Sequence, residues 1–260
     1  MSEYRSQYRQ DFLVDHILGR KENGFFLDIG AHNGITFSNS YFFEKARTWN
    51  GICVEPIKEV FLELKKNRTC HCENVAIFKE TGKVKFQKVS GVGEMLSGIK
   101  SNLNDNHLEK FKKEMDEAGE TVEVIECSSI TIEDLQLKYN FEEIDYISID
   151  IEGGEFDVIT SIDFNKIKVS CLTIENNDDS DERIKNYLIK SGYYFLFKYG
   201  VDEFYVLDPF KAMTNIINTE VYEIWLSSIV KGSRIKGKFL YLAKKYFGAA
   251  FVLRLGKLLR

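Results

Sequence analysis

The sequence predicts an α/β protein with a mostly parallel sheet, because short apolar runs alternate with stretches of helical apolar spacing. The runs expected as strands are FFLDI, GICVEP, NVAIF, DYISIDI, VSCLTIE, YYFLFKY and EFYVLD. The stretches expected as helices are 38–46, 58–66, 155–162 and 181–190. No helical pattern separates the last two runs, and Gly200 stands between them, so an antiparallel hairpin should close the sheet.

Three segments are expected along the chain of 260 residues. Residues 1–22 form a helical lead-in, residues 23–208 carry the sheet, and residues 209–260 form a basic helical extension. A long insertion, residues 80–139, separates the third and fourth expected strands. Long insertions of this kind commonly form lids or substrate walls, because loops carry function while the sheet supplies rigidity.

Charge is distributed unevenly between the body and the C-terminal extension. Residues 209–260 hold ten basic and two acidic residues, whereas the preceding residues hold 25 basic and 38 acidic ones. An acidic body disfavours a nucleic-acid partner. The stretch 231–260 has no acidic residue and many Phe, Leu and Tyr, so contact with a membrane surface and packing on the body or on a second copy of the chain stay open as alternatives.

The N-terminus is polar and charged where a signal peptide would need an apolar core, so the chain is expected in the cytoplasm, with the tail as its one candidate membrane contact. The five cysteines are odd in number and are expected to be reduced, mostly buried thiols. The spacing of Cys70, His71 and Cys72 suits no common zinc motif.

The stretch FFLDIGAHNG ends an apolar run in Asp28 and then places Gly30 and Gly34 in a turn. Such glycines let the backbone turn sharply and approach a ligand, and the N-terminus of the next helix points at the same place. The stretch lacks the second glycine of the dinucleotide fingerprint, which argues against a pyrophosphate. His32 lies inside the turn and is therefore expected near the ligand.

A second acidic residue follows the next strand. GICVEP places Glu55 at the strand end, where a carboxylate can accept both hydroxyls of a ribose, and Pro56 stops the strand. A glycine turn with these two acids suggests an adenosine ligand without a pyrophosphate. S-adenosylmethionine is the candidate that fits best.

The stretch DYISIDIEGGEFDVI carries most of the candidate chemistry. Alternate residues of a strand share a face, so Asp150 and Glu152 are expected together at its carboxyl end, where α/β sheets bind ligands. Glu155 enters the next helix, where interaction with the helix N-terminus is at least as good an explanation as catalysis. Asn176 and the polar residues after it end a further strand at the same edge, where they could also cap the following helix.

Taken together, FFLDIGAHNG, GICVEP, EMLSGI, DYISIDIEGGEFDVI and LTIEN resemble the FkbM-type S-adenosylmethionine-dependent O-methyltransferases, over roughly residues 23–208. The resemblance implies the Rossmann-like class I methyltransferase fold, a seven-stranded sheet whose last strand is antiparallel. It also implies that Asp28, Gly30, Gly34 and Glu55 surround the cofactor. The segment 94–99, which includes Ser97, would then lie beside the methionine end of the cofactor or the acceptor.

Two functions from different classes fit this sequence. The first is methylation of a hydroxyl on a sugar, a glycan or another small polar metabolite, for which the hydroxyl must lose its proton. A divalent ion, Mg²⁺ or Mn²⁺, held by Asp150 with Glu152 or with Asn176 and its neighbours, would acidify that hydroxyl. His32 is the alternative base.

The second function is a non-catalytic nucleoside-binding or scaffolding module docked by the basic tail. Paired carboxylates beside a cofactor cleft argue against it. The acceptor and the oligomeric state, including a homo-oligomer, are not decided by the sequence.

Overall fold

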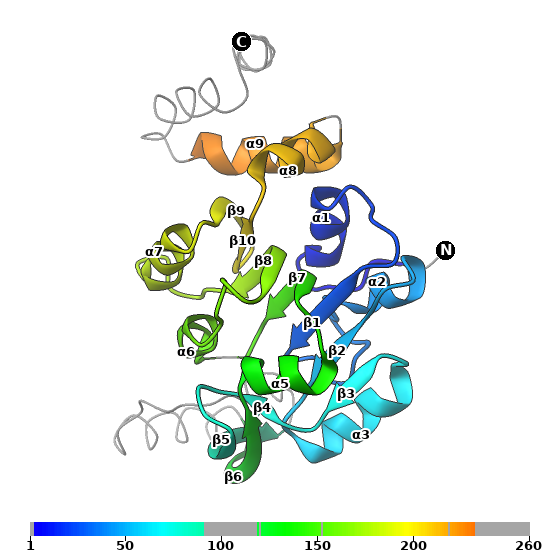
Figure 1. The fold of residues 1–260 in the computed structure, drawn as a ribbon, viewed down its shortest axis with the longest axis vertical. Coiled ribbons are helices and arrows are strands. Elements are labelled where there is room, and N and C mark those ends of the chain that lie inside the picture. The colour runs from blue at the N-terminus through cyan, green and yellow to red at the C-terminus, as the bar shows by residue number, and fades with distance from the viewer. Residues whose placement is uncertain (1–2, 91–118, 120, 152, 218, 232–260) are drawn as a thin grey trace.

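A seven-stranded sheet forms the centre of the molecule (Figure 1). The computed structural model describes residues 3–90, 119, 121–151, 153–217 and 219–231. In spatial order, the strands are β3 (His71–Glu73), β2 (Asn50–Val54), β1 (Phe25–Ile29), β7 (Glu143–Ile149), β8 (Lys168–Glu175), β10 (Asp202–Val206) and β9 (Tyr194–Tyr199). Neighbouring strands from β3 to β8 pair in parallel, and β10 is antiparallel to both β8 and β9. The predicted fold class is confirmed, including the antiparallel last strand.

Helices cover both faces of this sheet, as expected for strands that are apolar on both sides. One face carries α1 (Gln10–Ile17), α2 (Tyr41–Ala46), α8 (Pro209–Ile216) and α9 (Glu220–Lys231). The opposite face carries α5 (Ile132–Tyr139), α6 (Glu155–Thr160) and α7 (Arg183–Lys190). α3 (Lys58–Asn67) follows β2 and buries Leu64 in the core of the first face.

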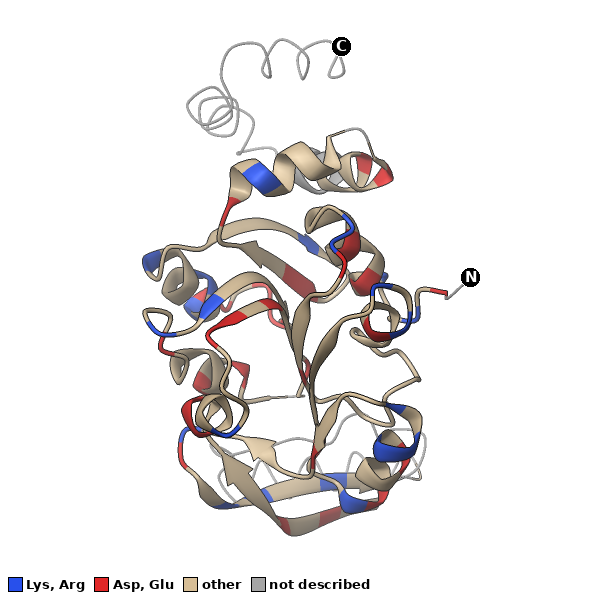
Figure 2. Cartoon of the chain, turned by 45° about the vertical axis from the view of Figure 1, so that its right-hand side comes forward, with Lys and Arg blue, Asp and Glu red and all other residues tan. Residues whose placement is uncertain are grey.

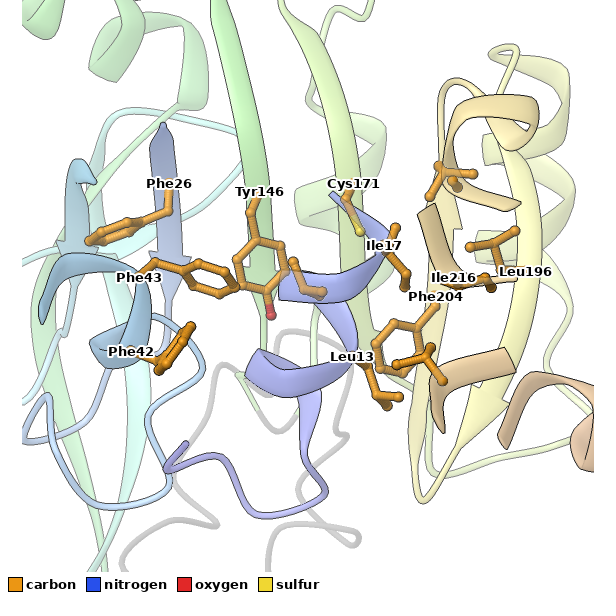
Figure 3. Close-up of a cluster of buried hydrophobic side chains, with 14 of the residues drawn as sticks. Leu13, Ile17, Phe26, Phe42, Phe43, Tyr146, Cys171, Leu196, Phe204 and Ile216 are labelled. Atoms are coloured by element: carbon orange, nitrogen blue, oxygen red, sulfur yellow. The ribbon is translucent and has the colours of Figure 1, made fainter. Parts of the chain in front are cut away.

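The core on the first face joins the two ends of the described chain (Figure 3). Leu13 and Ile17 of α1 pack in one cluster with Ile216 of α8 and Trp225 of α9, and all four are at most 2% exposed. Asn215 of α8 also donates a hydrogen bond from Nδ2 to the carbonyl oxygen of Ile17, at 2.8 Å. Residues beyond 208 therefore contribute to the core that covers the sheet.

The third strand of the sheet is not the one that the sequence predicts. β3 is the short polar stretch His71–Glu73, whereas the predicted strand NVAIF supplies only β4 (Ala76–Ile77) to a second sheet. The chain leaves the large sheet at Asn74, whose Nδ2 donates to the carbonyl oxygens of Glu55 and Pro56 at 2.9 and 3.0 Å. An edge strand buries little apolar surface, so a polar sequence can form it and hydrophobicity does not reveal it.

The predicted insertion contributes most of the second, three-stranded sheet. β5 (Gly82–Ser90) pairs antiparallel with β6 (Thr121–Ile130), and β6 pairs in parallel with β4. A small core that includes Ile57, Phe86 and Cys127 lies between this sheet and the start of α3. Residues 94–99 and Ser97 lie outside the described residues, as does all of the tail after residue 231, so the proposed membrane contact stays a prediction.

Charged residues of both signs are interspersed over the outer helices and the three-stranded sheet (Figure 2). None of the helices in the described part of the chain is long and apolar enough to cross a membrane.

Candidate functional site

The glycine turn after β1 is held between the two neighbouring strands. The amides of Gly30 and Ala31 both donate to the carbonyl oxygen of Val54 at the end of β2, at 3.1 and 3.0 Å. On the other side, the amide of Asp150 donates to the carbonyl oxygen of Ile29 at 3.1 Å. The turn is therefore fixed at the carboxyl ends of β2 and β7, where open α/β sheets bind their ligands.

Gly30 and Gly34 have positive φ angles, of 89° and 78°. A Cβ atom at Gly30 would lie 1.8 Å from the carbonyl oxygen of Asp150, and one at Gly34 would lie 2.6 Å from Cδ1 of Leu64. From the sequence, these glycines are expected to let the backbone approach a ligand. The structure shows a second reason for them, because the protein's own backbone and core leave no room for a side chain.

Asp28, the acidic residue before the turn, is buried and only 2% exposed. Its Oδ2 accepts a hydrogen bond of 2.5 Å from Ser40 Oγ, and Arg68 Nη2 donates to the same Ser40 Oγ at 3.0 Å. Burial raises the pKa of Asp28, against the opposing effects of the Ser40 hydrogen bond and the Arg68 charge. Asp28 therefore anchors the loop that follows the turn.

Asp28 belongs to a row of polar side chains that crosses the sheet on the α1 face. In strand register, Asp28 of β1 lies beside Ser148 of β7, which lies beside Thr173 of β8. Asn39 donates from Nδ2 to Ser148 Oγ at 2.9 Å, and Tyr146 Oη lies 2.7 Å from Thr173 Oγ1. The loop at 38–40 is thus fastened to the sheet by side chains that are almost completely buried.

Arg68 is the positive charge beneath this loop. Its side chain is fully buried, and Nε makes an ion pair of 2.6 Å with Glu44 Oε2. It also donates from Nη1 to the carbonyl oxygen of Gly34 and to Ser38 Oγ, both at 3.3 Å. Burial is the largest single effect on the pKa of Glu44 and would raise it. The Arg68 charge and the hydrogen bonds from Lys45, Arg68 and the Thr69 amide together lower that pKa well below its usual range.

Glu55 lies at the end of β2, beside the glycine turn, as the sequence predicts. The residue is 5% exposed, and its Oε1 accepts a hydrogen bond of 2.7 Å from the amide of Ile57. This bond shapes the entry to α3 after Pro56. A carboxylate can accept several hydrogen bonds, so this contact is compatible with a further role toward a ligand.

The carboxyl end of β7 leads directly into a glycine turn and α6. β7 ends at Ile149, so Asp150 follows the strand, and Glu152 lies outside the described residues. The amide of Gly153 donates to Glu155 Oε1 at 2.7 Å. That contact favours the explanation in which Glu155 stabilises the start of its helix.

Asn176, at the end of β8, uses both ends of its amide to shape the loop that follows. Its Oδ1 accepts from the Asp178 amide at 3.0 Å, and its Nδ2 donates at 3.2 Å to Glu203 Oε1 and to the Asp181 carbonyl oxygen. Within the described part of the chain, no three His, Cys, Asp or Glu residues are grouped so that they could hold a metal ion. The sequence prediction of a metal at Asp150, Glu152 and Asn176 remains a prediction.

A second pair of carboxylates lies along the same edge. Glu175, the last residue of β8, is in register with Asp202, the first residue of β10. Gln10 of α1 donates from Nε2 to Asp202 Oδ2 at 2.6 Å. Burial, with a smaller contribution from Glu175, raises the pKa of Asp202 to about 7, although Gln10 and Lys198 oppose the shift.

The sequence does not reveal the roles of most residues that hold the loop at 38–40. Ser148 is the exception with a readable signal, because it lies in the strand-like run two residues before Asp150, and alternate residues of an extended run share a face. Ser40 and Arg68 sit in ordinary loop and helix-end sequence, and their contacts span 12 and 28 residues. Only the fold brings them together.

The family model for the methyltransferase FkbM domain matches residues 28–198, from the end of β1 through most of β9. The chain belongs to the FkbM methyltransferase family. The match includes the glycine turn, Glu55, Asp150 and the end of β8, so it confirms the resemblance drawn from the sequence motifs.

Solved structures with similar folds share little sequence with this FkbM-family chain. An FkbM methyltransferase from Methylobacillus flagellatus KT is 13% identical with a TM-score of 0.45, over 71% of this chain and 43% of that one. An O-methyltransferase from Bacillus cereus in complex with SAH is 14% identical with a TM-score of 0.40, over 78% and 82%. TrmK from M. capricolum, in complex with S-adenosyl-homocysteine, is 12% identical with a TM-score of 0.38, over 95% and 94%.

The chain thus spans less than half the length of the Methylobacillus flagellatus structure. No curated protein matches the chain.

Proposed function

We propose that this member of the FkbM family is an S-adenosylmethionine-dependent O-methyltransferase that acts on a hydroxyl of a sugar, a glycan or another small polar metabolite. The observation that carries the proposal is the family's glycine turn, fixed between the carboxyl ends of β2 and β7 with Glu55 beside it. In open α/β sheets, ligands bind outside these strand ends.

The residues at this edge fit the cofactor. The acidic side chain of Glu55 suits the two ribose hydroxyls, since a carboxylate accepts hydrogen bonds from both. Asp28 acts through Ser40, which ties the loop at 38–40 to the sheet and so keeps the turn in place. S-adenosylmethionine would supply an electrophilic methyl group on a sulfonium.

The chain's own chemical task is to remove the proton of the acceptor hydroxyl. Asp150 follows β7 and touches the turn through its backbone, so its position suits a base or an ion ligand at the reacting end. His32 lies within the turn and is the second candidate base. A Mg²⁺ or Mn²⁺ ion at Asp150 and Glu152 would act instead by acidifying the hydroxyl. The amide of Asn176 is already engaged with three loop and strand groups, which leaves it a weaker candidate ligand.

Cofactor binding is tested by calorimetry with S-adenosylhomocysteine. Glu55→Gln keeps an oxygen for the Ile57 amide but removes the charge, and it should weaken binding by about 1 to 3 kcal/mol. Glu59→Gln is the matched control, because that side chain is 72% exposed on α3 and pairs only with Lys88 in the described contacts. If wild type and a folded Glu55→Gln protein bound S-adenosylhomocysteine equally well, Glu55 would not bind the ribose.

Methyl transfer is tested by mass spectrometry on a panel of sugars, glycans and small polar hydroxyl compounds. The expected product gains one methyl group on oxygen. Transfer to nitrogen or sulfur acceptors alone would overturn the O-methyltransferase proposal. Repeating the assay with a chelator and then with added Mg²⁺ or Mn²⁺ distinguishes metal assistance from a side-chain base, for which His32→Gln and Asp150→Asn are compared through their pH–rate profiles.

A further inference from the structure

Three of the five cysteines lie together where β2 pairs with β3. Cys53 of β2 is fully buried, whereas Cys70, which directly precedes β3, and Cys72 of β3 are partly exposed. The sulfur atoms of Cys53 and Cys70 are 3.6 Å apart. A disulfide bond is about 2.05 Å long, so the two sulfurs would have to approach each other by about 1.5 Å to form one.

The surroundings of this pair differ between the two sulfurs. Hydrogen bonds from the thiols of Cys53 and Cys72, together with the Arg68 charge, lower the pKa of Cys70 below its usual value. Burial raises the pKa of Cys53 well above its usual value. A partly exposed thiolate beside a buried thiol is the arrangement in which one cysteine reacts with an oxidant and its neighbour resolves the product.

We propose that Cys70 and Cys53 form a redox-sensitive pair, in which a peroxide oxidises Cys70 and Cys53 then closes a disulfide bond between them. This cysteine pair is distinct from the residues assigned to methyl transfer.

The chemistry balances with a peroxide as the only added reagent. The Cys70 thiolate attacks one peroxide oxygen, the O–O bond breaks, and the sulfur becomes a sulfenic acid while the other oxygen leaves as water or an alcohol after taking a proton. The Cys53 sulfur then attacks the Cys70 sulfur, the S–O bond breaks, and the oxygen leaves as water with the Cys53 proton. Two thiols lose two electrons in total, and the peroxide gains them.

Cys53 is the proposed resolving residue because its sulfur lies 3.6 Å from the Cys70 sulfur. The Cys72 thiol also interacts with the Cys70 side chain, and its sulfur donates to the backbone carbonyl oxygen of Cys70 at 3.6 Å. The Cys53 sulfur also lies 3.9 Å from Ser40 Oγ. Cys127 and Cys171 have no sulfur neighbour among the described contacts and serve as internal controls.

The disulfide would act on the loop that holds the turn. Cys53 is in register with Asp28, and both lie against Ser40, so drawing the Cys53 sulfur toward Cys70 would disturb the Asp28–Ser40–Arg68 contacts. Oxidation is therefore expected to weaken binding at the turn. This consequence, unlike the disulfide itself, rests on the proposed function.

The test treats the full-length protein with hydrogen peroxide, alkylates the remaining thiols and maps the peptides by mass spectrometry. The expected result is a Cys53–Cys70 disulfide that dithiothreitol reverses, with Cys127 and Cys171 alkylated. Cys53→Ser should instead accumulate the Cys70 sulfenic acid, which dimedone traps, and Cys70→Ser should give neither product. Cys72→Ser should still form the bond.

Any of three outcomes overturns the proposal. One is a folded wild-type protein in which Cys70 stays reduced under peroxide that oxidises a free thiol of similar exposure. The second is a disulfide between Cys70 and Cys72, and the third is an oxidation pattern that is unchanged in Cys70→Ser. The mapping on wild type decides the matter even if the Cys53→Ser protein does not fold.

A separate measurement addresses the consequence for binding. Affinity for S-adenosylhomocysteine is measured before oxidation, after oxidation and after reduction, in wild type and in Cys70→Ser. A several-fold loss that is reversible and confined to wild type supports the coupling. If the disulfide is mapped but the affinity is unchanged, oxidation of the cysteine pair does not affect binding at the turn. If the reduced protein does not bind S-adenosylhomocysteine at all, the proposed function is contradicted, but the disulfide proposal is not.

Discussion

The carbonyl oxygen of Asp150 occupies the space that a side chain at Gly30 would need, since a Cβ atom there would lie 1.8 Å from it. Gly30→Ala should therefore destabilise the fold by roughly 3 kcal/mol or more, through a backbone clash added to the strain of a positive φ. Gly192→Ala is the matched control, because Gly192 has φ 92° and open space around it, and it should cost only about 1 kcal/mol. Urea unfolding of both variants measures the difference, and equal losses would contradict the close approach.

Arg68 and Glu44 form an ion pair in which the side chains are 0% and 5% exposed. Arg68→Met should lower the free energy of unfolding by about 3 to 5 kcal/mol, because it leaves the Glu44 carboxylate buried with fewer partners. Arg183→Met removes the comparable pair with Asp181 at the surface, where the arginine is 65% exposed, and should cost no more than about 1 kcal/mol. Similar losses in the two variants would show that Arg68 does not support the loop as described.

Asp202 should make stability depend on pH. Its pKa is raised to about 7 in the fold, so between pH 4 and 7 the folded state holds a proton that the unfolded state releases. The free energy of unfolding therefore falls as pH rises through that interval. The charged groups that act on Asp202 are Glu175 and Lys198, with the neutral Gln10 donating to it.

Asp202→Asn keeps an oxygen for Gln10 and removes this proton. As the pH rises from 5 to 8, the free energy of unfolding should fall by about 1 to 3 kcal/mol more in wild type than in the variant. Urea unfolding at each pH measures this difference. Glu182→Gln, at a side chain that is 64% exposed, should follow the wild-type profile. Parallel profiles for wild type and Asp202→Asn would mean that Asp202 is charged in the fold throughout this range.

The helices after residue 208 should be part of the cooperative fold. Ile216 is fully buried in the cluster with α1, so Ile216→Ala should cost about 2 to 5 kcal/mol. Ile189→Ala removes the same atoms from a side chain that is 50% exposed on α7, and should cost well under half as much. Thermal unfolding of both variants gives the comparison; a small effect at Ile216 would mean that α8 contributes little to stability.

The sequence predicts the parts of this fold that depend on apolar periodicity. Six of the seven predicted strands lie in the large sheet because their residues must be buried, and Gly200 marks the final hairpin correctly. The edge strand His71–Glu73 is missed because an exposed edge makes no demand for hydrophobic residues. NVAIF is apolar because two of its residues, Ala76 and Ile77, are buried at the second sheet instead.

Residues of the candidate site also fall into those that the sequence predicts and those that it does not. Gly30, Gly34 and Glu55 stand in a local pattern that can be read along the chain, and the structure places them together at one edge. Arg68 and Asp202 acquire their environments only from long-range contacts, with Glu44 and with Gln10. Burial and charge at such positions depend on tertiary packing, which no short motif encodes.

The position of β10 between β8 and β9 has a consequence for synthesis on the ribosome. β9 is made before β10 but has no partner in the sheet until residues 202–206 arrive, because β10 separates it from β8. α1 is synthesised first, and its apolar residues are covered completely only when α8 and α9 have been made. Until residues 202–206 have been synthesised, the nascent chain therefore exposes an unpaired edge of β9. Until the chain reaches residue 225, it also exposes the apolar side of α1. Chaperones and aggregating neighbours bind to surfaces of both kinds.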